Sequence, residues 1–112
     1  MESSPPPHVQ ISARDLADRR ARGEAVTIVD VREPDELAIA RFPGALHIPL
    51  ALLPLRLAEL PADRALVLAC HHGARSMRAL QFLQGRGYQN VQNLEGGIDA
   101  WSRDVDPQVA RY

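Results

Sequence analysis

Two residue types that support covalent chemistry are scarce or missing. The sequence has no lysine, and its 112 residues include a single cysteine, Cys70. Without lysine, the chain cannot form a Schiff base with a carbonyl substrate. One cysteine cannot form an internal disulfide, which fits a reducing compartment, and we expect the protein in the cytoplasm. Any nucleophilic sulfur chemistry of the chain must therefore use Cys70.

Long apolar runs and an excess of charge of either sign are also missing. No stretch approaches the roughly 20 apolar residues that span a bilayer, and the first residues, Met1 to Pro7, lack the basic and apolar regions of a signal peptide. The formal net charge of −1 provides no bulk attraction to nucleic acid or to an anionic membrane, so we expect neither as a partner. We expect residues 1–8 to be a flexible lead-in and residues 9–112 to form one domain.

Short apolar runs alternate with segments of helical character along the chain. The apolar runs, several of them β-branched, predict strands over residues 25–31, 45–48, 65–69 and 91–94. Capping residues, prolines, glycines and apolar spacings of three predict helices from Ile11 to about Gly23, over residues 34–40 and 76–84, and after Gly97. We expect the leucine-rich residues 50–60 to be partly helical and to cover the core. This alternation predicts an α/β fold around a mainly parallel sheet.

Three polar residues follow two of the predicted strands. Cys70 comes directly after the run 65–69, and Asp30 and Arg32 lie at the end of the run 25–31. In open parallel sheets, ligands bind beyond the carboxyl ends of the strands, so we expect these residues at one edge of the sheet. For Asp30 and Arg32, a structural ion pair or cap is the alternative to a role in the site.

The segment Cys70-His71-His72-Gly73-Ala74-Arg75-Ser76 leads from a predicted strand into a predicted helix. Backbone N–H groups converge at such a junction and stabilise a thiolate or a bound oxyanion. Gly73 allows a positive φ, so consecutive N–H groups can face one centre. Arg75 adds a forked cation that matches an anion with several oxygens. The segment therefore combines a nucleophile with an anion site.

Each of these residues can also be interpreted as unreactive. The alternative for Cys70 is a buried, inert thiol, although the glycine, the arginine and the strand-to-helix junction favour reactivity. His71 and His72 can donate hydrogen bonds or carry partial charge, or they can be solvated loop residues. A metal site formed by Cys70, His71, His72 and His47 is unfavourable, because adjacent residues rarely converge on one ion and no usual zinc spacing is present. We expect no metal and no cofactor.

Four short segments occur in a fixed order between about Ile11 and Trp101. They are Asp30-Val31-Arg32-Glu33 with Glu36, Phe42-Pro43-Gly44-Ala45-Leu46-His47-Ile48-Pro49-Leu50, the loop Cys70 to Ser76, and Glu95-Gly96-Gly97-Ile98-Asp99-Ala100-Trp101. Together they resemble the single-domain rhodanese family of thiosulfate-type sulfurtransferases. The resemblance implies a rhodanese-like three-layer sandwich, with helices on both faces of the sheet and one rhodanese domain over residues 9–112.

The resemblance also implies roles for individual residues. Cys70 would take a sulfane sulfur from a small anionic donor such as thiosulfate and become a persulfide. The substrate-binding loop would comprise His71, His72, Gly73, Ala74, Arg75 and Ser76, with Asp30 and Arg32 bracing it and Trp101 in the core. Without a second cysteine, the persulfide must pass to an outside acceptor, which would be cyanide, a small thiol or a protein thiol.

Two other functions occur on the same fold. Phosphatases and some arsenate reductases of this fold place five residues between the cysteine and the arginine, whereas only four lie between Cys70 and Arg75. The smaller loop suits a single sulfur better than a tetrahedral phosphate. A non-catalytic rhodanese module that serves in binding or regulation is the second alternative, although such modules usually lack the cysteine. The sequence therefore predicts that the protein is a sulfurtransferase.

Overall fold

The computed structural model describes residues 9–112, and the predicted lead-in of residues 1–8 lies outside them. Five strands form one sheet in the order β1-β5-β4-β2-β3, and every pair of neighbours is parallel. The strands are β1 (Gln10–Ile11), β2 (Val26–Asp30), β3 (Leu46–His47), β4 (Ala65–Ala69) and β5 (Val91–Leu94). The predicted mainly parallel sheet is therefore confirmed, with β4 at its centre.

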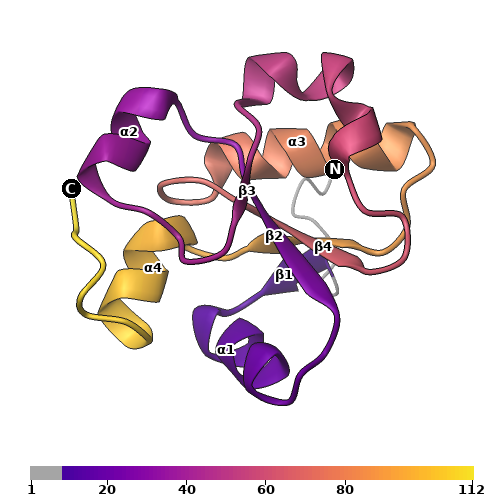
Figure 1. Ribbon diagram of the computed structural model, residues 1–112. Helices are drawn as coiled ribbons and strands as arrows, with labels where there is room; N and C mark the ends of the chain where they lie inside the picture. Colours follow the sequence, from indigo (N-terminus) through magenta and orange to yellow (C-terminus); the bar gives the residue numbers. More distant parts are fainter. Residues whose placement is uncertain (1–8) are drawn as a thin grey trace, which may run out of the picture.

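Helices cover both faces of this sheet (Figure 1). They are α1 (Ala13–Ala21), α2 (Pro34–Ile39), α3 (Ala74–Gly85) and α4 (Gly97–Asp104), with two 3₁₀ helices, η2 (Leu50–Leu55) and η3 (Leu57–Glu59). The helices α1 and α4 lie on one face, and α3 lies with the 3₁₀ segment on the other. This arrangement is the predicted three-layer α/β sandwich.

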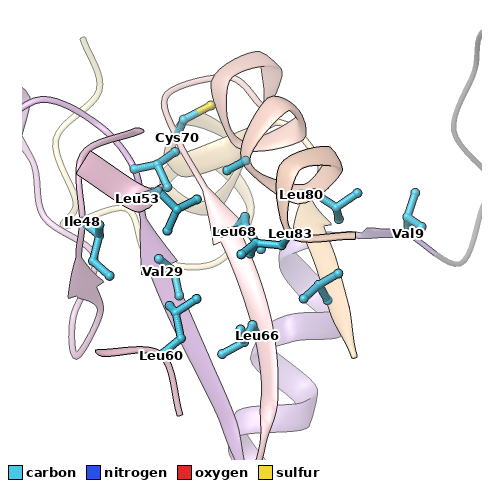
Figure 2. Close-up of a cluster of buried hydrophobic side chains, with 13 residues drawn as sticks. Val9, Val29, Ile48, Leu53, Leu60, Leu66, Leu68, Cys70, Leu80 and Leu83 are labelled. Atoms are coloured by element: carbon cyan, nitrogen blue, oxygen red, sulfur yellow. The ribbon is translucent and has the colours of Figure 1, made fainter. Parts of the chain in front are cut away.

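Side chains of the central strand β4 point alternately to the two faces of the sheet, so the core consists of two layers. All five residues of β4 are buried, because helices cover the sheet from both sides. Leu66, Leu68 and Cys70 face the α3 side, whereas Val67 and Ala69 face the α1 and α4 side. Figure 2 shows the α3 layer, with the Cys70 side chain at the end of the strand. Burying each such Leu or Val side chain contributes about 1.5–3 kcal/mol, so the position of Cys70 is held by a well-packed strand.

The first helix begins later than predicted. Ile11 belongs to β1, where it pairs with Leu94 of β5, so its assignment to the helix was wrong. Ser12 caps α1 as predicted, because its Oγ accepts a hydrogen bond of 3.1 Å from the N–H of Asp15. A strand of two residues has no periodicity, and Ile11 lies directly before the cap, so sequence patterning merged it with the helix.

Two other elements differ in detail from the prediction. Helix α3 begins at Ala74, two residues before the predicted start, and this places Arg75 and Ser76 in its first turn. The predicted apolar stripe is present, since Leu80 and Leu83 are buried and Met77 packs against them. Residues 50–60 form 3₁₀ turns, with Leu53 and Leu60 buried as predicted and Leu55 84 % exposed. The segment therefore covers the core with only part of its leucines.

None of the helices found between residues 9 and 112 is long and apolar enough to cross a membrane.

Candidate active site

The sulfur of Cys70 lies at the carboxyl end of the central strand, directly before α3. Cys70 is only 1 % exposed, and its side chain packs in the α3 layer of the core. Gly73 has a φ of +115°, a conformation that residues with a Cβ rarely adopt, and it caps the N-terminus of α3. The chain thereby turns from β4 into α3 around the sulfur, as predicted from the loop sequence.

Backbone N–H groups of the loop point at this sulfur. The N–H groups of Gly73 and Ser76 lie 3.1 Å and 3.4 Å from the Sγ of Cys70. Both belong to the first turn of α3 or its cap, where N–H groups have no partner within the helix. Such donors stabilise a thiolate or a persulfide anion at the position of the sulfur.

Asn93 on the neighbouring strand β5 supports the loop through Ser76, in the first turn of α3. The Oγ of Ser76 lies 2.5 Å from the Oδ1 of Asn93 and 3.3 Å from the Sγ of Cys70. A hydroxyl has one hydrogen, and the shorter contact indicates that Ser76 donates it to Asn93. The Nδ2 of Asn93 in turn donates to the carbonyl of Gly73 at 3.4 Å. This buried amide on β5 therefore holds Gly73 and Ser76, the two residues whose N–H groups face the sulfur.

The N-terminus of α4 fixes the start of the loop. The N–H of Ile98 donates to the carbonyl of Cys70 at 2.8 Å, and the N–H of Asp99 donates to that of His71 at 3.1 Å. A Cβ at Gly97 would overlap both carbonyl oxygens. The Gly96-Gly97 pair is therefore needed for α4 to approach the loop, which explains this part of the motif.

The two loop histidines form a stack that ends on the C-terminal tyrosine. The ring of His71 lies 3.9 Å from that of His72 and 3.8 Å from that of Tyr112, measured between centroids. Burial lowers the pKa of His71, and the neighbouring His72 lowers it further. The Nε2 of His71 is buried without a hydrogen-bond partner among the described residues. His71 is therefore a neutral, packed residue at pH 7, while the side chain of His72 is exposed.

Arg75 forms a bidentate ion pair with Glu36 of α2. Its Nη1 and Nη2 lie 2.5 Å and 2.8 Å from the two carboxylate oxygens. The hydrogen bond with Arg75 is the main cause that lowers the pKa of Glu36 to about 2, and the same bond raises the pKa of Arg75. The Arg75 side chain stays 34 % exposed. The guanidinium thus lies beside the loop with much of its charge compensated.

Asp30 and Arg32 form a buried ion pair rather than a direct support of the loop. The shortest contact is 2.7 Å, and both side chains are at most 1 % exposed. Arg32 also donates to the carbonyl of Ala40 and to the hydroxyl of Tyr112, both at 2.8 Å. Between residues 9 and 112, neither Asp30 nor Arg32 makes a hydrogen bond to the loop 70–76. Arg32 is linked to the loop through Tyr112, whose ring stacks on His71, and through Glu36, whose carbonyl lies 3.5 Å from Arg32 and whose carboxylate binds Arg75.

Comparison with known proteins agrees with this geometry. Residues 12–104 match the sequence profile of the rhodanese-like domain. The chain belongs to the rhodanese-like family. A sulfurtransferase of Allochromatium vinosum is 45 % identical over 101 residues, which cover 90 % of this chain and 94 % of that protein. A putative sulfurtransferase of Bacillus subtilis is 33 % identical, with 88 % and 95 % covered. These relatives identify this rhodanese-like protein as a sulfurtransferase.

A solved structure shows the same fold. The crystal structure of a rhodanese-related protein from Thermoplasma volcanium is 34 % identical, covering 92 % of this chain and 98 % of that chain with a TM-score of 0.79. The predicted rhodanese-like three-layer architecture is thus confirmed by the structure of this protein and by a solved relative.

Several residues of the rhodanese-like site had no role in the sequence interpretation. Glu36 was part of a motif, but nothing in the sequence indicated that it reaches Arg75, 39 residues later. Asn93 was placed only in a strand, although an amide in a buried run is a signal for an internal hydrogen-bond network. Tyr112 lies in a tail that carried no motif. Each of the three acts across the fold, so local patterning has little power to find it.

One group of three side chains near the rhodanese loop has the spacing of metal ligands. His71, His72 and Asp99 each offer a ligand atom within 4.8 Å of the others. Asp99, however, pairs with Arg111 at 3.1 Å, and the stacked rings of the histidines have nearly parallel planes. His47 binds the carbonyl of Arg32 instead, at 2.7 Å. The geometry therefore does not bring together the four residues considered from the sequence.

An open cleft of about 300 Å³ borders the loop. His72 and Gly73 form part of its lining, together with Met77, Asn93 and Gly96. The cleft gives small molecules access to the outer side of the Gly73 turn, whose N–H group faces the buried sulfur.

Proposed function

We propose that this sulfurtransferase carries sulfane sulfur as a persulfide on Cys70. The observation that carries the proposal is the pair of N–H groups, from Gly73 and Ser76, within 3.4 Å of the Sγ of Cys70. A persulfide adds a second sulfur and keeps a negative charge, which these donors stabilise without the help of a metal. The remaining loop residues, His71, His72, Ala74 and Arg75, would surround the transferred sulfur.

The proposed donor is a small anion, with thiosulfate as the first candidate. The Cys70 thiolate attacks the outer sulfur of thiosulfate, a new S–S bond forms, and the S–S bond of thiosulfate breaks to release sulfite. The negative charge of the thiolate ends on the terminal sulfur of the persulfide, so no proton or external electron is needed. The loop N–H groups support binding of such an anion.

The proposed acceptor is a second molecule. The sequence contains no other cysteine that could attack the persulfide within the chain. Cyanide, a small thiol or a protein thiol would take the terminal sulfur and return Cys70 to the thiolate. A free thiolate of this kind persists in a reducing compartment, and the cytoplasm is the proposed location.

The alternative as a phosphatase or arsenate reductase has less support. Only four residues separate Cys70 from Arg75. The two terminal nitrogens of Arg75 already bind Glu36, whereas an enzyme that binds a tetrahedral oxyanion needs this fork for its substrate. Both observations favour sulfur transfer.

The test is sulfur transfer by the purified protein. Incubation with thiosulfate and cyanide should produce thiocyanate, and intact-mass spectrometry after thiosulfate alone should show one added sulfur on Cys70. Cys70→Ser should abolish both signals, while the isosteric side chain keeps the fold and its unfolding midpoint close to those of the wild type. An unmodified Cys70 after thiosulfate treatment would support the non-catalytic module, and phosphatase turnover without sulfur transfer would overturn the proposal.

A further inference from the structure

The carboxylate of Glu36 accepts four hydrogen bonds. Oε1 accepts from the N–H of Glu33 at 3.0 Å and from Nη1 of Arg75 at 2.5 Å. Oε2 accepts from Nη2 of Arg75 at 2.8 Å and from the hydroxyl of Tyr112 at 2.9 Å. A carboxylate offers about four acceptor sites, so Glu36 is saturated. It joins the N-terminus of α2, the N-terminus of α3 and the C-terminal segment beside the Cys70 loop.

This saturation keeps the carboxylate charged and in place. Its pKa of about 2 means that Glu36 is ionised at every pH used in an enzyme assay. Its side chain is 16 % exposed, so water screens the pair with Arg75 less than it screens a surface ion pair. Glu36 is therefore a permanent negative charge next to the one arginine of the loop.

Two further arginines, Arg32 and Arg111, are paired with carboxylates in the same way. Arg32 binds Asp30 at 2.7 Å, and Arg111 binds Asp99, whose N–H holds the carbonyl of His71. His71 adds no charge at neutral pH, because burial lowers its pKa. The charges of Arg32, Arg75 and Arg111 are thus matched by carboxylates, and the backbone N–H groups are left as the main attraction for an anion.

Resting on the sulfurtransferase function proposed above, we infer that Glu36 determines donor specificity by cancelling the charge of Arg75. A site with a free guanidinium would favour a dianion such as thiosulfate over a monoanion. A compensated site loses most of that preference, because the N–H groups bind the sulfur and its nearest oxygens whatever the total charge of the donor. Glu36 should therefore reduce the difference between the rates at which a dianionic and a monoanionic sulfane donor react with Cys70.

The test compares two donors that differ by one charge. Thiosulfate and methanethiosulfonate both transfer their outer sulfur to a thiolate, and they release sulfite and methanesulfinate. The readout is the second-order rate constant for persulfide formation on Cys70, expressed as the ratio of thiosulfate to methanethiosulfonate. Damage to the loop slows both donors and leaves this ratio unchanged, whereas a change in site charge moves it.

Glu36→Gln should raise this ratio about twofold to fivefold, the size expected for the loss of one screened charge near the donor. Asp35→Asn is the matched control, because it removes one exposed charge from the same helix turn. Its ratio should stay at the wild-type value. An unchanged ratio in Glu36→Gln, or an equal rise in both variants, would overturn the inference.

If Glu36→Gln does not fold, the inference can still be tested by the dependence of the two wild-type rate constants on ionic strength. With Arg75 compensated and Cys70 present as a thiolate, neither rate constant should fall as ionic strength rises, because screening then weakens only the repulsion between like charges. A steeper fall for thiosulfate than for methanethiosulfonate would reveal an uncompensated cation and contradict the inference. If neither donor modifies Cys70 in the wild type, the proposed function itself fails, so the two failures are distinguishable.

Discussion

Gly97 lies so close to Cys70 that a Cβ at position 97 would overlap the carbonyl oxygen of Cys70. The same atom would meet the carbonyl of His71, and both carbonyls accept hydrogen bonds from the first turn of α4. The shape of the loop around the sulfur thus depends on a missing side chain in a different element.

Gly97→Ala should therefore damage both stability and sulfur transfer. The φ of +60° alone costs about 1–2 kcal/mol for a residue with a Cβ, and the overlap with backbone atoms adds to this cost and shifts the loop. Gly23→Ala is the matched control, since Gly23 also has a positive φ but nothing lies within 4 Å of its added Cβ. Urea unfolding and Cys70 persulfide formation should show a stability loss in both variants but a transfer loss only in Gly97→Ala. Equal transfer in the two variants would contradict this account.

The pair of Glu36 and Arg75 should stabilise the fold in a pH-dependent way. The pKa of Glu36 falls from 4.5 in the unfolded reference to about 2 in the folded protein, so the unfolded chain binds the proton more tightly. The stability from this pair is thus fully present above about pH 4.5 and is lost as the pH falls toward about 2. Because Arg75 is a third exposed and water screens the pair, we expect a contribution of about 1 kcal/mol to the free energy of unfolding. The gap in unfolding free energy between wild type and Glu36→Gln should close over this range, and a gap independent of pH would refute the assignment.

His71 should not contribute charge to donor binding at neutral or alkaline pH. Burial and the neighbouring His72 lower its pKa below 6.5, so the ring is already neutral at about pH 7. For sulfur transfer from thiosulfate, His71→Gln should keep the wild-type shape of the pH profile above about pH 7. A decline with rising pH that is present in the wild type and absent in His71→Gln would show that the imidazolium takes part.

The Tyr112 hydroxyl should stabilise the fold although it lies near the surface. It accepts a hydrogen bond from Arg32 and donates one to Glu36, both charged partners. Tyr112→Phe removes these bonds but keeps the ring stacked on His71, and we expect a loss of about 1–2 kcal/mol. Tyr88→Phe is the control, because the Tyr88 hydroxyl makes no hydrogen bond between residues 9 and 112. Equal unfolding midpoints for the two variants would show that the hydroxyl bonds are without effect.

Local sequence patterns were sufficient to predict β4 and α3, the two elements that flank the loop. The apolar run 65–69 predicted β4, and the spacing of Met77, Leu80 and Leu83 predicted α3, because each pattern records which face of an element is buried. Gly73 was identified for its positive φ, which the structure confirms. The two-residue strand β1 was missed, because its hydrogen-bond partners lie more than 80 residues away on β5.

The sequence by itself determined the parallel α/β architecture, the strand-to-helix junction at Cys70 and the family motifs, since local apolar patterns and capping residues indicate each of them. Only the tertiary structure decided which charges meet. It pairs Arg75 with Glu36, buries Asp30 against Arg32, and brings Tyr112 onto His71. The physical reason is that the parallel sheet gathers the ends of distant segments at one edge, where a long arginine side chain has several carboxylates within reach. That choice sets the charge around the sulfur, and no local pattern encodes it.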